Sequence, residues 1–234
     1  MKISGQKIFW GTYWKIYRSL AAVRPYKKTV DRGINLLEVK DGGRYLDLAC
    51  GPGITSRKLK DAGRNLSVLG IDSSKSGLAI ARADNPDIHF AVADFNMPLP
   101  IKSRSMDGVF ANNAFYLVKD PVTTLGRIRD ILRPGGMFVM STPKEGARPF
   151  AIVREHLKGS RGIFEPFRVF AMFLAFLPFQ IALKGSAGGA ANFWSQEKWE
   201  AVLEDARLKG IEFEVVAAEP SYADQNTTFA LRRT

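Results

Sequence analysis

The chain has 234 residues, of which 46% are hydrophobic, so it is long enough to bury a sizeable core in one decorated α/β domain. Its single cysteine excludes an internal disulfide, and its first residues carry charges with no apolar run of signal-peptide length between them. We therefore expect a cytoplasmic protein.

The net charge of +11 is unevenly distributed along the chain. Residues 1–40 hold nine Lys and Arg against two acids, and residues 141–192 hold seven against three, while the remaining residues sum to zero. The charge pattern predicts a neutral core with two basic additions.

The first of these additions combines basic and aromatic residues. Trp10, Tyr13, Trp14 and Tyr17 recur at the spacing of one helical face, between Lys7 and Arg18. Such a helix could dock on the domain, or it could cover a bound cofactor and anchor the protein at a membrane interface, where aromatic and basic residues are favoured.

Residues 45–53 are the most informative stretch. An apolar run followed by Gly51, Pro52 and Gly53 predicts a buried strand, a tight turn and a helix from about Ile54. Such a turn lets a ligand approach the backbone and offers it the free N–H groups of a helix start. Asp47 would repel a pyrophosphate there and attract a cationic ligand. Asp72, 21 residues after Gly51, ends a second strand at the spacing of a ribose-binding carboxylate.

Strands and helices alternate through the rest of the chain. After a helix over about 27–40, the pattern predicts helices over about 74–85, 121–132 and 196–209. It predicts further strands over about 88–93, 106–113, 137–141, 211–217 and 227–232.

Residues 143–192 interrupt this alternation. Phenylalanines recur at every third position from Phe164 to Phe179, which on a helix spreads them almost right round the axis. The uncharged run over 169–183 is too short to span a bilayer. Three interpretations remain open: a helical cap over an apolar acceptor pocket, an element that dips into a membrane surface, or additional core.

The motifs from Asp47 to Gly53, at Asp72, over residues 93–95 and over residues 132–136 resemble the class I methyltransferases that use S-adenosylmethionine. The similarity covers about residues 44–142 and is closest to the small-molecule and lipid branch, which includes quinone-biosynthesis enzymes. It implies a Rossmann-like α/β fold with a seven-stranded, mostly parallel sheet, an antiparallel final strand, helices on both faces and a helical insertion after the fifth strand. The implied division is a lid (1–40), a cofactor-binding core (41–142), an insertion (143–192) and the rest of the core fold (193–234).

The resemblance also implies the site residues. Those expected to bind S-adenosylmethionine are Tyr13, Tyr17, Asp47, Ala49, Cys50, Gly51, Gly53, Asp72, Ser73, Asp94, Phe95 and Asn112. Asp94 would accept a hydrogen bond from the adenine amino group, or else cap a turn, and Phe95 would pack on the ring. Cys50 is expected as a small residue in a crowded turn rather than a nucleophile.

Two further residues are candidates on the acceptor side. Tyr116 stands where the small-molecule branch places a polar residue near the acceptor, and His156 in the insertion could act as a base. His89 is expected to be structural, and no metal site is expected. The Asn/Asp-Pro-Pro-Tyr motif of base-amino methyltransferases does not occur at this place.

The leading hypothesis is a methyltransferase for an apolar or amphiphilic small molecule (a lipid, a quinone or an isoprenoid-like compound) at the inner face of a membrane. Residues 1–20 and 163–183 would make the membrane contact. The alternatives are an RNA methyltransferase, for which the positive charge argues, and a scaffold that binds S-adenosylmethionine without catalysis.

Overall fold

A computed structural model describes residues 13–14, 17–158 and 193–234. The expected phenylalanine-rich helix, Trp10 and most of the N-terminal aromatic segment lie outside the described residues.

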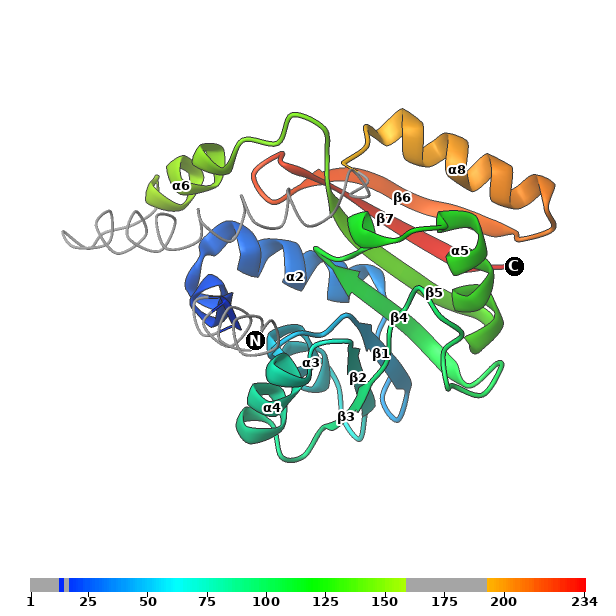
Figure 1. Ribbon diagram of the computed structural model, residues 1–234, viewed down its shortest axis with the longest axis horizontal. Coiled ribbons are helices and arrows are strands. Elements are labelled where there is room, and N and C mark those ends of the chain that lie inside the picture. Colours follow the sequence, from blue (N-terminus) through cyan, green and yellow to red (C-terminus); the bar gives the residue numbers. More distant parts are fainter. Residues whose placement is uncertain (1–12, 15–16, 159–192) are drawn as a thin grey trace, which may run out of the picture.

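The centre of the molecule is a seven-stranded sheet with the order β3-β2-β1-β4-β5-β7-β6 (Figure 1). Its strands are β1 (Arg44–Leu48), β2 (Ser67–Asp72), β3 (His89–Val92), β4 (Met106–Asn112), β5 (Leu132–Pro143), β6 (Phe213–Ser221) and β7 (Asn226–Arg233). Strands β1 to β5 are paired in parallel, and β7 is antiparallel to both β5 and β6. The expected Rossmann-like sheet with an antiparallel final strand is confirmed.

Helices cover both faces of this sheet. They are η1 (Arg18–Ala22), α2 (Arg24–Leu36), α3 (Ile54–Lys60), α4 (Lys75–Asp84), η2 (Phe115–Leu117), α5 (Pro121–Ile131), α6 (Pro149–Leu157) and α8 (Gln196–Leu208). One buried cluster joins α2 and α3 to the sheet through residues such as Val30, Leu59 and Phe110, and a second joins α5 and α8 through Ile128, Trp199 and Phe138. Because helices cover both faces at the centre of the sheet, β1, β4 and β5 are buried along most of their length, whereas the edge strands β3 and β6 are mostly half-buried or exposed.

Local sequence signals set where several helices begin. The side chains of Ser74, Asp120 and Ser195 accept hydrogen bonds from backbone N–H groups in the first turns of α4, α5 and α8. Each therefore satisfies a donor that the helix itself leaves free. These three starts agree with the prediction.

Two expected boundaries were wrong. Helix α2 covers 24–36 rather than 27–40, because Pro25 is accommodated in its first turn, where no N–H is needed, and Glu38 adopts a positive φ of 51° soon after its end. Strand β5 begins at Leu132 instead of 137, since Leu132 already pairs with Met106 before the register shifts.

Helix α2 lies unusually close to the sheet at Gly33. A Cβ atom built on Gly33 would come within 2.4 Å of the Phe110 ring on β4, so only glycine fits at this position. This close approach brings the N-terminal half of α2 over the carboxyl ends of β1 and β4.

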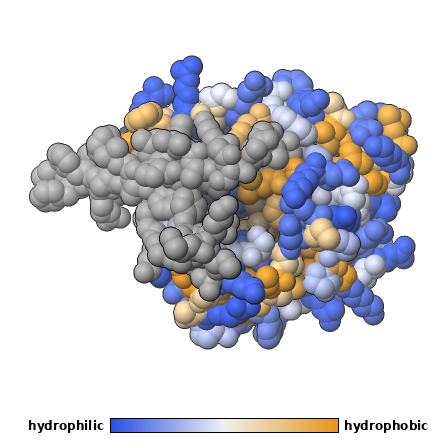
Figure 2. All heavy atoms as spheres, in the orientation of Figure 1, coloured by the Kyte–Doolittle hydropathy of each residue, from blue (hydrophilic) through white to orange (hydrophobic). Residues whose placement is uncertain are grey.

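Surface features agree with a protein whose polar side chains face outward. Figure 2 shows hydrophilic residues over much of one face, with hydrophobic patches between them. Among the described residues, no helix combines the length and the hydrophobicity needed to cross a membrane.

Candidate functional site

A cavity of about 730 Å³ opens at the carboxyl ends of β1, β2 and β4. In the strand order, β1 is the point where the chain stops adding strands on one side and crosses to β4 on the other. Open α/β sheets bind ligands in the crevice at such a switch point. The position of the cavity therefore follows from the topology.

We divide the cavity into two halves by the elements that form them. The acid half, from β1, β2 and the turns after them, contains Asp47, Ala49, Cys50, Gly51, Asp72 and Ser73. The tyrosine half comes from the N-terminal segment, α2, the end of β4 and the following turn with η2. It contains Tyr13, Tyr17, Tyr26, Asn112, Asn113 and Tyr116.

Asp47 is the most deeply buried acid of the site, with 1% of its surface exposed. It accepts a hydrogen bond of 2.5 Å from the Ser56 hydroxyl on α3. Burial raises the pKa of Asp47 to about 7, the Ser56 hydrogen bond opposes this shift, and the nearby charge of Asp72 adds to it. A cationic ligand beside Asp47 would favour the ionised carboxylate.

Asp72 organises the two turns that face the cavity. Its Oδ2 accepts a hydrogen bond from the Gly51 N–H at 2.9 Å, and its Oδ1 accepts one from the Ser74 N–H at 2.7 Å. Burial raises the pKa of Asp72, and the two N–H donors partly offset that effect. The carboxylate thus ties the glycine turn to the start of α4, while each oxygen retains a lone pair for a ligand.

The indole of Trp14 packs over the glycine turn. A Cβ built on Gly51, whose φ is 50°, would lie 2.7 Å from this ring, and one built on Gly77 would lie 3.1 Å from it. The indole N–H donates a 2.8 Å hydrogen bond to the Ser74 hydroxyl. Trp14 therefore covers the acid half from the N-terminal side.

Aromatic rings dominate the opposite half. Five of the six tyrosines of the chain gather here: Tyr13, Tyr17, Tyr26 and Tyr116 line the cavity, and Tyr222 packs against Tyr26 with ring centroids 6.2 Å apart. Burial raises the pKa of Tyr116 to about 12 and raises those of Tyr13 and Tyr17 well above their ordinary value. At neutral pH these hydroxyls are protonated, so they can donate hydrogen bonds but cannot act as bases.

Asn112 stands at the end of β4 with 7% of its surface exposed. Neither its Oδ1 nor its Nδ2 has a well-formed hydrogen bond within the described part of the chain, although the Tyr26 hydroxyl is close by. A buried amide without partners is costly, and in a cavity wall it is typical of a group that meets a ligand.

The structure brings most of the predicted site residues together. Eleven of the fourteen line the cavity: Tyr13, Tyr17, Asp47, Ala49, Cys50, Gly51, Asp72, Ser73, Phe95, Asn112 and Tyr116. Burial raises the pKa of the Cys50 thiol well above its usual value, which agrees with a small packing residue rather than a nucleophile.

Gly53, Asp94 and His156 are not among the lining residues. Gly53 has a φ of 80°, and a Cβ there would meet Asn85 and Ala81 within about 3.1 Å, so its place is explained by the packing of α3 on α4. Asp94 is exposed and accepts a 2.9 Å hydrogen bond from the Asn96 N–H, the turn-capping arrangement that the sequence left open.

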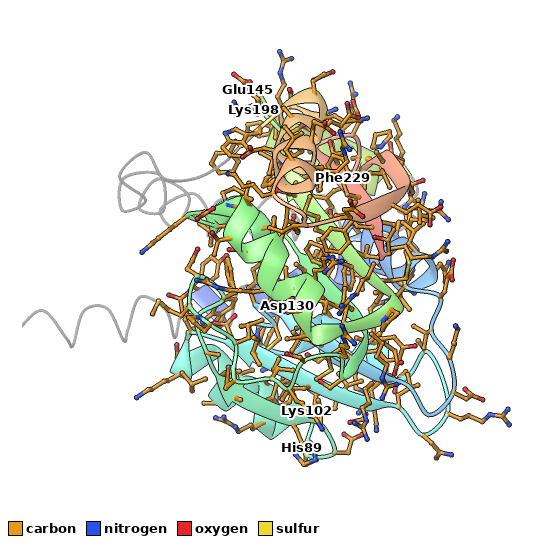
Figure 3. The ribbon with its side chains drawn as sticks, turned by 90° about the vertical axis from the view of Figure 1, so that its right-hand side faces the viewer. His89, Lys102, Asp130, Glu145, Lys198 and Phe229 are labelled. Carbon is orange, nitrogen blue, oxygen red and sulfur yellow. The ribbon has the colours of Figure 1, made fainter. Side chains whose placement is uncertain are left out.

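His156 was predicted to approach the acceptor, and the structure does not place it there. It is buried at the end of α6, where its Nδ1 accepts a 3.0 Å hydrogen bond from the Arg24 N–H at the start of α2. The sequence could not show that α6 packs on α2. His89 is exposed at the start of β3 and is not among the residues that line the cavity. Figure 3 shows it at the opposite end of the molecule from Glu145 and Lys198. Its structural role stays a prediction.

Several lining residues were missed from the sequence. They are Trp14, Tyr26, Ile54, Thr55, Ser74, Lys75, Ser76, Asn113, Ala114 and Leu117. Trp14 shares the predicted aromatic face with Tyr13 and Tyr17, and Ser74 stands at the start of the helix predicted over about 74–85, so both carried a signal. Tyr26 carried none, because its role depends on the close approach of α2 to β4.

Residues 46–140 match the model of a protein family described as a methyltransferase domain. Residues 46–140 form a class I S-adenosylmethionine-dependent methyltransferase domain. The expected family is confirmed over this part of the chain.

Two curated relatives are similar to this part of the chain. The chain is 34% identical over 104 residues to trans-aconitate 2-methyltransferase of Methylobacterium radiotolerans, which covers 44% of this chain and 39% of that protein. It is 27% identical over 150 residues to demethylmenaquinone methyltransferase of Bacillus subtilis, covering 59% and 64%. In both cases the match spans less than two thirds of the relative.

A methyltransferase from Aquifex aeolicus that depends on S-adenosylmethionine shares the fold. The two chains align with a TM-score of 0.62 at 16% identity, over 94% of this chain and 97% of that one.

The acid half of the methyltransferase domain fits S-adenosylmethionine. This cofactor supplies a methyl group that is already activated by attachment to a positively charged sulfur. Asp47 and Asp72 provide negative charge beside the turn at Gly51. Lys75 is the single basic residue among the described lining residues, so this wall favours a cation.

Proposed function

We propose that the protein transfers a methyl group from S-adenosylmethionine to an apolar or amphiphilic small molecule such as a lipid, a quinone or an isoprenoid-like compound. The observation that carries this proposal is the composition of the tyrosine half. The tyrosine half faces the acid half across one cavity. Its described residues offer aromatic rings and neutral amides to the acceptor.

In this proposal Asp72 and Ser73 hold the ribose, Phe95 packs on the adenine, and Asp47 with Ala49, Cys50 and Gly51 faces the cationic part of the cofactor. Tyr13 and Tyr17 close the cavity from the N-terminal side. Holding donor and acceptor in line can lower the barrier by about 7 to 11 kcal/mol, so positioning is the main task of these residues. A base is needed only if the acceptor loses a proton.

The names of the two relatives pose a choice between acceptors. Trans-aconitate carries three carboxylates, whereas a demethylmenaquinone is a ring with a long apolar chain. Lys75 is the one basic residue among the described lining residues, and it belongs to α4 beside the acid half. A polyanionic acceptor would lack counter-charges, so the cavity favours the apolar class.

The test is to incubate the purified full chain with radiolabelled S-adenosylmethionine and either a total lipid extract or trans-aconitate. We expect label in an organic-soluble fraction of the lipid reaction and none above background with trans-aconitate. Binding of S-adenosylhomocysteine without labelling of any fraction would instead favour the non-catalytic scaffold.

We also propose peripheral contact with an anionic membrane, on the cytoplasmic side. The surplus positive charge lies in residues 1–40 and 141–192. Within the described part, α6 presents Phe150, which is 75% exposed, and the exposed Arg154. Exposed aromatic and basic side chains together are typical of membrane-surface helices.

Sedimentation with phosphatidylglycerol vesicles tests this contact. The wild type should sediment with these vesicles, and a Phe150→Ser, Arg154→Glu double variant should sediment less. With phosphatidylcholine vesicles neither protein should sediment. Equal sedimentation of both proteins would argue against a contact through α6.

The positive charge also keeps RNA methylation as a second candidate. It predicts binding of a structured RNA that weakens steeply as salt rises, together with label in the RNA. The shortage of basic residues argues against it, since a nucleic-acid acceptor would bring phosphates next to a cavity with one described basic side chain.

A further inference from the structure

Two consecutive asparagines, Asn112 and Asn113, both line the cavity at the end of β4. In an extended strand, neighbouring side chains point to opposite faces of the sheet. Asn113 avoids this because its φ is 53°, in the left-handed region that asparagine tolerates better than most residues. The turn at Asn113 therefore presents two amides in succession to the same cavity.

The orientation of the second amide depends on a residue more than a hundred positions away. The Nδ2 of Asn226, at the start of β7, donates a 2.6 Å hydrogen bond to Asn113 Oδ1 and a 3.0 Å bond to the Ser141 hydroxyl. Asn226 is 1% exposed. Because the Asn226 amide nitrogen holds the Asn113 Oδ1 on its own side, the Asn113 Nδ2 points away from Asn226.

This pair belongs to a buried polar chain beneath the tyrosine half. The Ser141 hydroxyl lies 3.3 Å from the Ser221 hydroxyl, which accepts a 2.7 Å hydrogen bond from Thr228. The backbone N–H of Asn113 also donates to the Ser141 carbonyl at 2.8 Å. Contacts to backbone and side chain together hold Asn113 firmly, as a ligand-binding amide requires.

Asn112 adds an amide whose polar atoms make no well-formed hydrogen bond among the described residues, although the Tyr26 hydroxyl is close by. The six residues of the tyrosine half include no Asp, Glu, Lys, Arg or His. What these side chains can offer is therefore hydrogen bonding without charge, next to aromatic rings that accept a flat apolar body.

We propose that Asn112 and Asn113 form an amide subsite that binds a carbonyl oxygen of an uncharged ring compound, the methyl acceptor, and that Asn226 is the positioning residue that makes Asn113 a donor there. This inference rests on the proposed function and narrows its acceptor class. Asn112, expected from the sequence to contact the cofactor, is assigned to the acceptor.

The test uses small probes in place of the acceptor, measured by titration calorimetry on the full chain saturated with S-adenosylhomocysteine. The probes are 1-tetralone, whose carbonyl only accepts a hydrogen bond, 1-naphthol, which also donates one, and the hydrocarbon tetralin. Wild type should bind 1-tetralone about fivefold more tightly than tetralin, the value of one net hydrogen bond of about 1 kcal/mol.

The Asn226→Asp variant should invert this preference. With acceptor oxygens in place of Nδ2, Asn113 gains by turning its amide, which directs Oδ1 into the cavity. Binding of 1-tetralone should fall to the level of tetralin and 1-naphthol should become the preferred probe, while the affinity for S-adenosylhomocysteine stays unchanged. Asn113→Asp should shift the preference in the same direction. It tests the same amide directly, even if Asn226→Asp does not fold.

Asn85→Asp is the matched control, since Asn85 is also buried, with 4% exposed, but caps α4 and hydrogen-bonds to Ala81. It should keep the wild-type order of the probes. An unchanged order in both Asn226→Asp and Asn113→Asp overturns the subsite. Failure of the wild type to bind S-adenosylhomocysteine would instead overturn the proposed function, so the two failures are distinguishable.

Discussion

The two halves of the cavity are built in different ways. The acid half comes from two neighbouring strands and their turns, with Asp47, Gly51 and Asp72 all within 26 consecutive residues. The tyrosine half draws on positions from Tyr13 to Tyr116, with support from Tyr222 and Asn226. Charge and backbone geometry define the first half, whereas neutral aromatic packing defines the second. We therefore expect substitutions in the acid half to change cofactor binding and those in the tyrosine half to change acceptor binding.

The largest effect should come from Asp72→Ala. This change removes a carboxylate from the cofactor side and leaves the N–H groups of Gly51 and Ser74 without their acceptor. In the proposed site this carboxylate binds the ribose, and the loss of two hydrogen bonds from the ribose hydroxyls to a charged group predicts about 100-fold weaker binding of S-adenosylhomocysteine. Calorimetric titration measures it.

The control for Asp72 is Asp87→Ala, which removes an exposed carboxylate that pairs with Arg57. Its affinity should stay within about twofold of wild type, as for most surface substitutions. Comparable losses in both variants would mean that the acid half is not the cofactor site.

The second prediction concerns pH and Asp47. The pKa of its carboxyl is raised to about 7, so much of it is protonated at pH 6 without cofactor. A cationic cofactor favours the ionised form. The affinity for S-adenosylmethionine should therefore rise with pH by up to about tenfold per unit below pH 7 and level off above it. Asp47→Asn should remove this dependence, and a wild-type affinity independent of pH would refute the electrostatic role.

The free energy of unfolding without ligand should depend on pH in the opposite sense and fall as the pH rises. An acid whose pKa is raised in the folded state stabilises the fold below its ordinary pKa, and this contribution is lost as pH rises towards about 7. Without ligand, Asp47→Asn should therefore raise the free energy of unfolding relative to wild type at about pH 8, measured by urea denaturation. A lower value there would show that Asp47 stabilises the fold in its charged form.

The third prediction tests how Trp14 covers the glycine turn. Gly51→Ala places a methyl group 2.7 Å from the indole at a positive φ, and we expect about tenfold weaker binding of S-adenosylhomocysteine. Adding Trp14→Ala should relieve the steric part, so the two changes should be less than additive in free energy. If the effects of the two changes on the binding free energy were strictly additive, Trp14 would not cover Gly51 in solution.

Gly42→Ala is the matched control for the backbone strain. Gly42 has a φ of 74°, but a Cβ atom added to it would have no neighbour within 4 Å, so alanine there meets strain without a collision. It should reduce the melting temperature without changing cofactor affinity.

The same contrast explains how much the sequence could predict. The alternation of strands and helices and the turn at Gly51 are local signals. The resemblance to the class I methyltransferases, which rests on local motifs, then implied the fold and most of the acid half. Tyr26 and Asn226 have no local signal. Tyr26 reaches the cavity through the close approach of Gly33 to Phe110, and Asn226 reaches Asn113 through the pairing of β7 with β5. His156 was assigned wrongly for the same reason, since its neighbour Arg24 is 132 positions away.

The smallest expected effect is that of Tyr116→Phe, and it decides what the tyrosine half does. Tyr116 stacks on Phe193 with ring centroids 5.0 Å apart, and phenylalanine preserves this packing. Because the pKa of Tyr116 is raised to about 12, its hydroxyl is protonated and can contribute one hydrogen bond at most. With the labelled lipid fraction as substrate, we expect KM for the acceptor to rise by about threefold to tenfold, with kcat and the affinity for S-adenosylhomocysteine unchanged. A fall in kcat of about 100-fold or more at constant KM would instead assign Tyr116 to the chemical step, and the tyrosine half would then have a catalytic role beyond binding.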